Sequence, residues 1–175
     1  VTADPDVVLG AERIVLPGVG AFRACMEALS AIPGMIDAME TAVLRQGRPF
    51  LGICVGMQLL ADAGEEHGRW AGLGWIGGTV RRLVPDDSAC KIPHMGWNDV
   101  RPTREHPLIV PGEAYFLHSY AIQDIDPALC LATTEHGGEV IAAVGRDNIV
   151  GVQFHPEKSQ SYGLALLTRF LDWKP

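Results

Sequence analysis

A cysteine between two glycines is the first place in this sequence where chemistry is expected. The segment Gly52-Ile53-Cys54-Val55-Gly56 has the form G-x-C-x-G and lies between an apolar run and a helical pattern. This is the context of a nucleophile elbow, with cysteine in the place of serine. The tight turn puts the sulfur at a helix N-terminus, which stabilises a thiolate and lowers the pKa of the thiol. We therefore predict that Cys54 is a nucleophile rather than a buried structural cysteine.

A histidine and a glutamate two residues apart are the candidate base and its orienting acid. His155-Pro156-Glu157 follows an apolar run about a hundred residues after Cys54. Proline biases the residue before it toward extended geometry, and residues two apart in an extended segment project to the same side. Glu157 is thus expected to accept a proton from one ring nitrogen of His155, which leaves the other nitrogen to deprotonate Cys54. If His155 is considered without Cys54, the alternative is a surface or strand-end histidine that has no catalytic role.

A glycine-rich turn is the candidate site for a developing oxyanion. Pro17-Gly18-Val19-Gly20 follows a short apolar run and precedes a helical pattern. Because glycines flank Val19, its N–H can turn inward and form a pair of donors with the N–H of Val55. In isolation the same residues are equally typical of an ordinary Pro-Gly turn.

The other cysteines and histidines show neither elbow context nor the paired spacing of a zinc site, so no metal and no cofactor are predicted. They are Cys25, Cys90, Cys130, His67, His94, His106, His118 and His136.

The elements that position these residues alternate in the first half of the chain. Arg13–Leu16 and Pro49–Ile53 are predicted strands, Ala21–Ala31 and Ile36–Gln46 have helical spacing, and a helical run continues from Cys54 to Ala63. This order predicts a parallel sheet with right-handed crossovers.

The second half instead has short strand candidates separated by Gly, Pro, Asp and Asn, as in antiparallel hairpins. These strands are predicted at Trp75–Val84, Ile92–Val100, Ala114–Gln123, Leu129–Thr134, Val140–Val144 and Ile149–Phe154, and a helix is predicted at Tyr162–Trp173.

Length and composition bound the class of protein. The 175 residues carry 47% hydrophobic and 20% charged side chains, which fits one globular domain over 1–175. A net charge of −7 argues against binding to a nucleic-acid backbone. No apolar run reaches the length of a bilayer span, and no signal peptide is evident. We expect a cytoplasmic protein with reduced thiols.

Together the motifs resemble class I (triad-type) glutamine amidotransferases. Gly-Ile-Cys-Val-Gly-Met-Gln at 52–58, His-Pro-Glu at 155–157 and Pro-Gly-Val-Gly at 17–20 carry this resemblance. With Pro-His-Met-Gly-Trp-Asn at 93–98, they look like the glutaminase subunits of imidazole glycerol phosphate synthases. The resemblance covers essentially the whole chain. It implies a three-layer, flavodoxin-like α/β fold in which an antiparallel strand region is added to a parallel central sheet.

The resemblance also implies a role for each matched position. Cys54, His155 and Glu157 would be the catalytic triad. The oxyanion region would comprise Gly18, Val19, Gly20 and Val55, and glutamine would be held by Gly18, Gly52, Gln58, His118, Ser119 and Tyr120. Met95, Trp97, Asn98 and Lys158 would face a barrel-shaped cyclase, the synthase subunit. The implied reaction is hydrolysis of L-glutamine, with ammonia passed to that cyclase.

The sequence departs from this family at its start. Family members open with a strand, an Asp-Tyr-Gly-Ser-Gly-Asn loop and a helix, none of which precedes the segment that begins at Val1. Either these residues were removed by processing or truncation, or the fragment folds poorly. Since a first strand is typically internal in a doubly wound sheet, its absence predicts unpaired backbone groups and exposed apolar surface.

Three rival functions remain open at this point. The first is a glutaminase that serves another synthase, because such proteins have similar catalytic motifs. Residues 93–98 are the segment that discriminates between these synthases. A binding module without chemistry disagrees with the intact Cys-His-Glu set. A cysteine hydrolase acting on γ-glutamyl peptides is the third.

Overall fold

A seven-stranded sheet forms the centre of the computed structural model, which describes all residues 1–175. The strand order is β1-β2-β11-β10-β9-β6-β7. The bounds are β1 Ile14–Gly18, β2 Phe50–Cys54, β6 His94–Pro102, β7 Gly112–His118, β9 Cys130–Glu135, β10 Glu139–Arg146 and β11 Ile149–Val152. Strands β1, β2 and β11 are parallel, whereas the pairs from β11 to β7 are antiparallel. The predicted parallel sheet with an antiparallel extension is therefore confirmed.

The two strands at the centre of the parallel part are buried along their whole length. Every residue of β2 and of β11 is buried. Parallel strands covered on both faces have near-continuous apolar sequences, as these two have. The carboxyl ends of β1, β2 and β11 meet at one edge of the sheet, which is where ligands bind in open α/β sheets.

A second sheet of four strands has the order β4-β3-β5-β8. Its strands are β3 Ala63–Gly64, β4 Trp70–Ala71, β5 Thr79–Arg82 and β8 Tyr120–Gln123. The single strand predicted over Ala114–Gln123 is thus wrong, because the chain leaves the first sheet after His118 and enters the second at Tyr120. At the intervening residue, the Ser119 carbonyl accepts a hydrogen bond from the Leu83 amide.

The helices differ from the prediction in three places. The helices are α1 Pro5–Leu9, α2 Phe22–Ser30, α3 Met35–Glu40, α4 Val55–Gln58 and α5 Gln160–Asp172, with a π-helix at Thr41–Arg45 and 3₁₀ turns at Pro127–Leu129 and Pro156–Lys158. Helix α1 was not predicted, although Asp4 caps it by accepting from the Asp6 amide and Pro5 stands at its first turn. The helix predicted over Ile36–Gln46 changes to π geometry at Thr41.

The helix after Cys54 is much shorter than the predicted run to Ala63. The Leu59 carbonyl accepts a hydrogen bond from Leu73, and the Leu60 carbonyl accepts from both Trp75 and Ile76. These carbonyls are therefore paired with a segment distant in sequence instead of with a following helical turn. Tertiary hydrogen bonds, which local periodicity does not encode, end α4 at Gln58.

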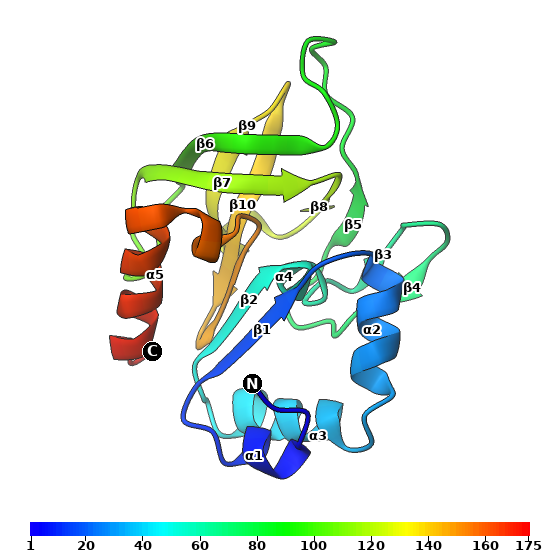
Figure 1. Cartoon of the computed structure of the whole chain (residues 1–175), viewed down its shortest axis with the longest axis vertical. Helices are drawn as coiled ribbons and strands as arrows, with labels where there is room; N and C mark the ends of the chain where they lie inside the picture. The colour runs from blue at the N-terminus through cyan, green and yellow to red at the C-terminus, as the bar shows by residue number, and fades with distance from the viewer.

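Strand β1 forms one edge of the seven-stranded sheet. An apolar groove of about 620 Å³ lies beside it, lined by residues of β1 and of the helices α1 to α3, among them Val8, Val15 and Met35. Figure 1 shows these N-terminal helices grouped around β1 and β2, with α5 on the opposite side of the sheet from α2. None of the helices has the length and apolar character needed to traverse a bilayer.

Candidate active site

Cys54 lies on a strained turn between β2 and α4. Its φ of 53° and ψ of −111° fall outside the regions that ordinary L-residues prefer. The turn requires close approach of the backbone: a Cβ on Gly52 would lie 2.6 Å from the Gly56 carbonyl oxygen, and a Cβ on Gly56 would overlap the Leu16 carbonyl oxygen. The predicted nucleophile elbow is present, and the flanking glycines are there because no side chain fits.

Burial keeps the Cys54 sulfur protonated at neutral pH. The side chain is only 4% exposed. Desolvation raises the pKa of the Cys54 thiol to about 11, although the Val55 N–H acts in the opposite direction. The lowered pKa expected from the helix N-terminus is thus wrong, because desolvation outweighs the effect of the Val55 N–H at the start of α4.

His155 is oriented by Glu157 at a distance of 2.8 Å between Nδ1 and Oε1. The ring is 3% exposed, whereas the Glu157 side chain is 55% exposed. The predicted pairing is present and His155 itself is extended, as predicted, but Glu157 lies in the 3₁₀ turn Pro156–Lys158 instead of an extended segment. The backbone of His155 is anchored by its amide, which donates to the Tyr115 carbonyl at 2.9 Å. The other ring nitrogen, Nε2, is buried and has no hydrogen-bond partner.

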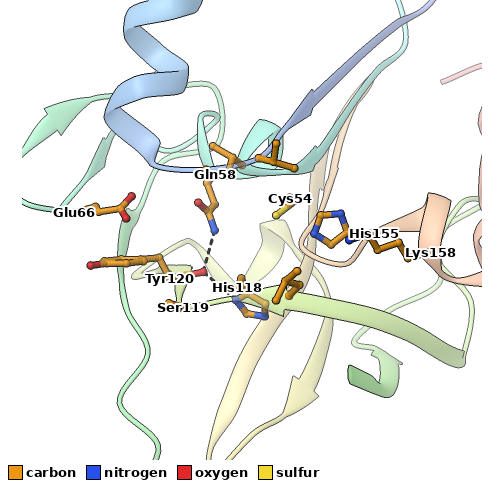
Figure 2. A pocket seen from close by; sticks show the side chains of 12 residues that line it. Cys54, Gln58, Glu66, His118, Ser119, Tyr120, His155 and Lys158 are labelled. Carbon is orange, nitrogen blue, oxygen red and sulfur yellow. Dashed lines mark hydrogen bonds between the residues drawn. The ribbon is translucent and has the colours of Figure 1, made fainter. Parts of the chain in front are cut away.

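A pocket of about 180 Å³ brings most of the predicted site residues together. It is lined by Val19, Gly20, Cys54, Val55, Gln58, His118, Ser119, Tyr120 and His155 from the prediction, and by Lys158, which was predicted for the partner interface. Figure 2 shows Cys54 between Gln58 on one side and His155 on the other. Segments from β1, β2, β7–β8 and the end of β11 thus converge on one small cavity.

Two predicted substrate residues do not line this pocket. Gly18 and Gly52 lie in strands, next to the turn after Cys54. A Cβ on Gly18 would come within 2.9 Å of the Gly56 amide nitrogen. Both glycines pack closely against the elbow, which explains why no larger residue fits at these positions.

The candidate oxyanion loop contributes Val19 and Gly20 to the lining of the pocket. Gly20 has a φ of +99°, a conformation that favours glycine. The Val19 carbonyl accepts a hydrogen bond from the Cys25 thiol at 3.4 Å. Val19, Gly20 and Val55 all line the pocket that Cys54 lines.

Glu66 and Gln153 belong to the site but were not predicted. The Glu66 carboxylate accepts from the Phe22 amide at 2.9 Å and lines the pocket at the end away from His155. Gln153 is fully buried, and its amide nitrogen lies 3.8 Å from the Cys54 sulfur. Glu66 stands in a loop without any local signal. Gln153 had one: it is a polar residue in an otherwise apolar run.

The four residues predicted for a partner interface do not share one face. Met95 and Trp97 are 60% and 47% exposed on β6. Trp97 packs edge-on against Tyr115, whose ring centroid lies 5.9 Å from the Lys158 Nζ. Asn98 projects from the other face of β6, where its amide donates to the Glu135 carbonyl.

Comparison with known proteins gives a consistent result. The matching family is described as "Glutamine amidotransferase class-I", and the match covers residues 6–172. The imidazole glycerol phosphate synthase subunit HisH of Zymomonas mobilis is 69% identical over 176 residues, which cover 100% of this chain and 83% of that protein. The HisH subunit of Rhodospirillum rubrum is 56% identical, with 100% and 84% covered.

A solved structure of a glutamine amidotransferase has the same fold. It superimposes with a TM-score of 0.73 at 17% identity, over 98% of this chain and 83% of that one. The nucleophile elbow, the His-Glu pair and the fold had pointed to the same family before this comparison. The chain belongs to the class I glutamine amidotransferases.

Proposed function

We propose that this chain is the glutaminase subunit of an imidazole glycerol phosphate synthase and acts in histidine biosynthesis. It hydrolyses L-glutamine to glutamate and ammonia. The observation that carries this proposal is that Cys54 and His155, whose ring is hydrogen-bonded to Glu157, line one small pocket. The identity of 69% to a HisH subunit over the whole chain supports the choice of synthase.

The pocket supports a single small amino acid as the substrate. Its volume of about 180 Å³ lies below the ~300–1,000 Å³ of pockets for drug-sized ligands. Gln58 directs its amide nitrogen away, toward the Tyr120 carbonyl, so its oxygen is available to a ligand. That oxygen and the Glu66 carboxylate are acceptors suited to the α-ammonium of glutamine. The side-chain carboxamide then extends toward Cys54.

The reaction proceeds through a thioester. His155 takes the Cys54 proton at Nε2, and the sulfur forms a bond to the carboxamide carbon. The oxyanion is stabilised by the Val55 N–H and by a peptide N–H of the Val19–Gly20 loop. His155 returns the proton to the departing nitrogen, the carbon–nitrogen bond breaks and ammonia leaves. Water, deprotonated by His155, then cleaves the thioester and releases glutamate.

A cyclase partner is proposed for the face that carries Met95, Trp97 and Lys158. Exposed Met and Trp side chains are enriched in protein interfaces. Lys158 belongs both to this face and to the lining of the pocket, so the partner would bind beside the site of ammonia release. The ammonia would be added there to a ribulosyl-phosphate aminoimidazole carboxamide intermediate.

The test is glutamine hydrolysis by the purified chain with and without the cyclase and its substrate. Cys54→Ala is expected to abolish ammonia release, at least about 10⁴-fold, because no other group forms the thioester. Cys90→Ala is the control, since Cys90 lies in a distant loop outside the pocket. Turnover at the normal rate by Cys54→Ala would contradict the proposal. Stimulation by a different synthase, but not by the cyclase, would assign the chain to that other enzyme.

A further inference from the structure

We propose that Gln153 and His94 are positioning residues of the glutaminase site, because they belong to one hydrogen-bond network with a fixed direction that ends at the Cys54 sulfur. The network consists of Asn98, His94, His118, Tyr120, Gln58, Gln153 and Cys54. This inference rests on the proposed function. It adds two residues to the site. Gln153 contacts Cys54 and Gln58, and His94 contacts His118.

The backbone carbonyl of Tyr120 determines the direction of every bond in the network. A carbonyl oxygen can only accept, and this one receives the Gln58 Nε2 and the His118 Nδ1, each at 2.9 Å. Gln58 must therefore direct its amide nitrogen toward β8. A neutral His118 must carry its proton on Nδ1.

On one side of the carbonyl, the network runs to the nucleophile. The Gln58 nitrogen also donates to the Gln153 Oε1 at 3.0 Å. Gln153 consequently has its oxygen toward Gln58 and its Nε2 toward the Cys54 sulfur, 3.8 Å away. Gln153 has no exposed surface, and its backbone N–H donates a hydrogen bond to the Ala142 carbonyl. Its N–H is thus a donor to the sulfur, which stabilises the thiolate when it forms.

On the other side, the network runs away from the pocket through two imidazoles. Since the His118 Nε2 carries no proton, it accepts from the His94 Nδ1 at 3.0 Å. The His94 Nε2 then accepts from the Asn98 amide, also at 3.0 Å. The remaining Asn98 proton goes to the Glu135 carbonyl. Every donor in this part meets an acceptor, so a single neutral tautomer of each ring satisfies the network.

Burial supports this arrangement of neutral rings. The His94 ring is 3% exposed and stacks on Phe116 and on His136. Desolvation lowers the pKa of His94 to about 3 and that of His118 to about 4. Both rings are therefore neutral at the pH of catalysis, as the directed network requires.

Three variants separate the roles by kinetics. Gln153→Glu keeps an acceptor for Gln58 and, at a pH at which the carboxyl is ionised, has no donor for the sulfur, so kcat there is expected to fall about ten- to a hundredfold with KM little changed. Gln153→Met loses both bonds and should also raise KM. His94→Phe keeps the aromatic stack but loosens His118 and Tyr120, so it should raise KM several-fold and leave kcat nearly unchanged.

Alkylation of Cys54 provides a readout that a merely structural role would not change. At about pH 8, the rate of modification by iodoacetamide, resolved by mass spectrometry, follows the thiolate population. It is expected to fall about tenfold in Gln153→Met and to stay unchanged in His94→Phe. Two controls lose comparable bonds elsewhere: Asn148→Ala, whose amide holds the start of β11, and His136→Phe, which stacks on His94 but lies outside the network.

The unmodified chain gives a test that does not depend on the folding of variants. Nitrogen-15 NMR should show His94 and His118 both protonated on Nδ1, and the Gln153 side-chain amide should shift when Cys54 is alkylated. A ring protonated on Nε2, an unmoved Gln153 amide, or folded Gln153 variants with normal kcat and alkylation would overturn the inference. If those variants are normal while Cys54→Ala is inactive, only the positioning role fails. Activity in Cys54→Ala would instead remove the proposed function.

Discussion

The reactivity of a single residue, Cys54, depends on its burial. The side chain is almost inaccessible, and desolvation raises the pKa of the thiol to about 11. The acceptor for its proton, Nε2 of His155, is buried without a partner. The site thus holds a neutral thiol and an imidazole nitrogen without a partner, and the thiolate is expected to form as the oxyanion and its donors come to share the charge. We therefore expect low activity of the isolated chain.

This resting state predicts how alkylation of Cys54 depends on pH. Burial disfavours the thiolate, so its population below the pKa rises tenfold with each pH unit and levels off only near pH 11. In the unfolded chain the same thiol should level off near its ordinary pKa of 9.0. The measurement is the rate of iodoacetamide modification between about pH 6 and 10, with and without denaturant. A folded-state profile that levels off at or below pH 9 would contradict it.

At the scale of elements, the elbow between β2 and α4 depends on glycines at close contacts. Strand β1 passes directly beside the turn, so the Leu16 carbonyl occupies the space that a Cβ on Gly56 would need. Gly52 is likewise confined by the Gly56 carbonyl. The packing of two strands and a short helix therefore holds the strained conformation of Cys54.

Gly56→Ala is accordingly expected to displace the elbow. The new methyl group collides with backbone, which cannot rotate away, so the free energy of unfolding should fall by about 1–3 kcal/mol. Ammonia release should fall at least about a hundredfold, because a shift of the sulfur by an ångström breaks its alignment. Gly10→Ala is the matched control, since its Cβ would meet only ordinary contacts beginning at 3.5 Å. Denaturant unfolding and glutaminase assays measure both effects, and equal behaviour of the two variants would refute the steric argument.

At the scale of the whole molecule, the chain presents an apolar face next to the pocket. Met95 and Trp97 project outward from β6, and Lys158 links this face to the cavity. Asn98 faces the other way and belongs to the network behind the site. The alternation of side chains along β6 thus separates a surface suited to a partner from the residues that position the substrate groups.

Trp97→Ala should therefore weaken the proposed cyclase contact without disturbing the fold. Loss of a large aromatic side chain at an interface commonly costs 2 kcal/mol or more, so the concentration of cyclase for half-maximal stimulation should rise about thirtyfold. Stability should change little, because the side chain is half exposed. Leu171→Ala removes a comparably exposed apolar side chain on α5 and is the control. Titration of glutaminase activity with the cyclase measures the effect, and an unchanged midpoint would place the interface elsewhere.

The sequence by itself determined the parts of the site that local patterns encode. The glycines around Cys54 indicated the elbow, the His-Pro-Glu segment indicated the orienting pair, and apolar runs located β1, β2 and β11. These features depend on backbone sterics and on residues within a few positions of one another.

Only the tertiary structure decided features that depend on segments distant in the sequence. The pKa of Cys54 reflects burial by several elements. Helix α4 ends because the carbonyls after Gln58 accept hydrogen bonds from residues about fourteen positions later. Glu66 reaches the pocket from a loop. The orientation of Gln153 likewise follows from a carbonyl on β8, in the other sheet. Desolvation and hydrogen bonding act between groups that folding brings together, and no local pattern in the chain records those distances.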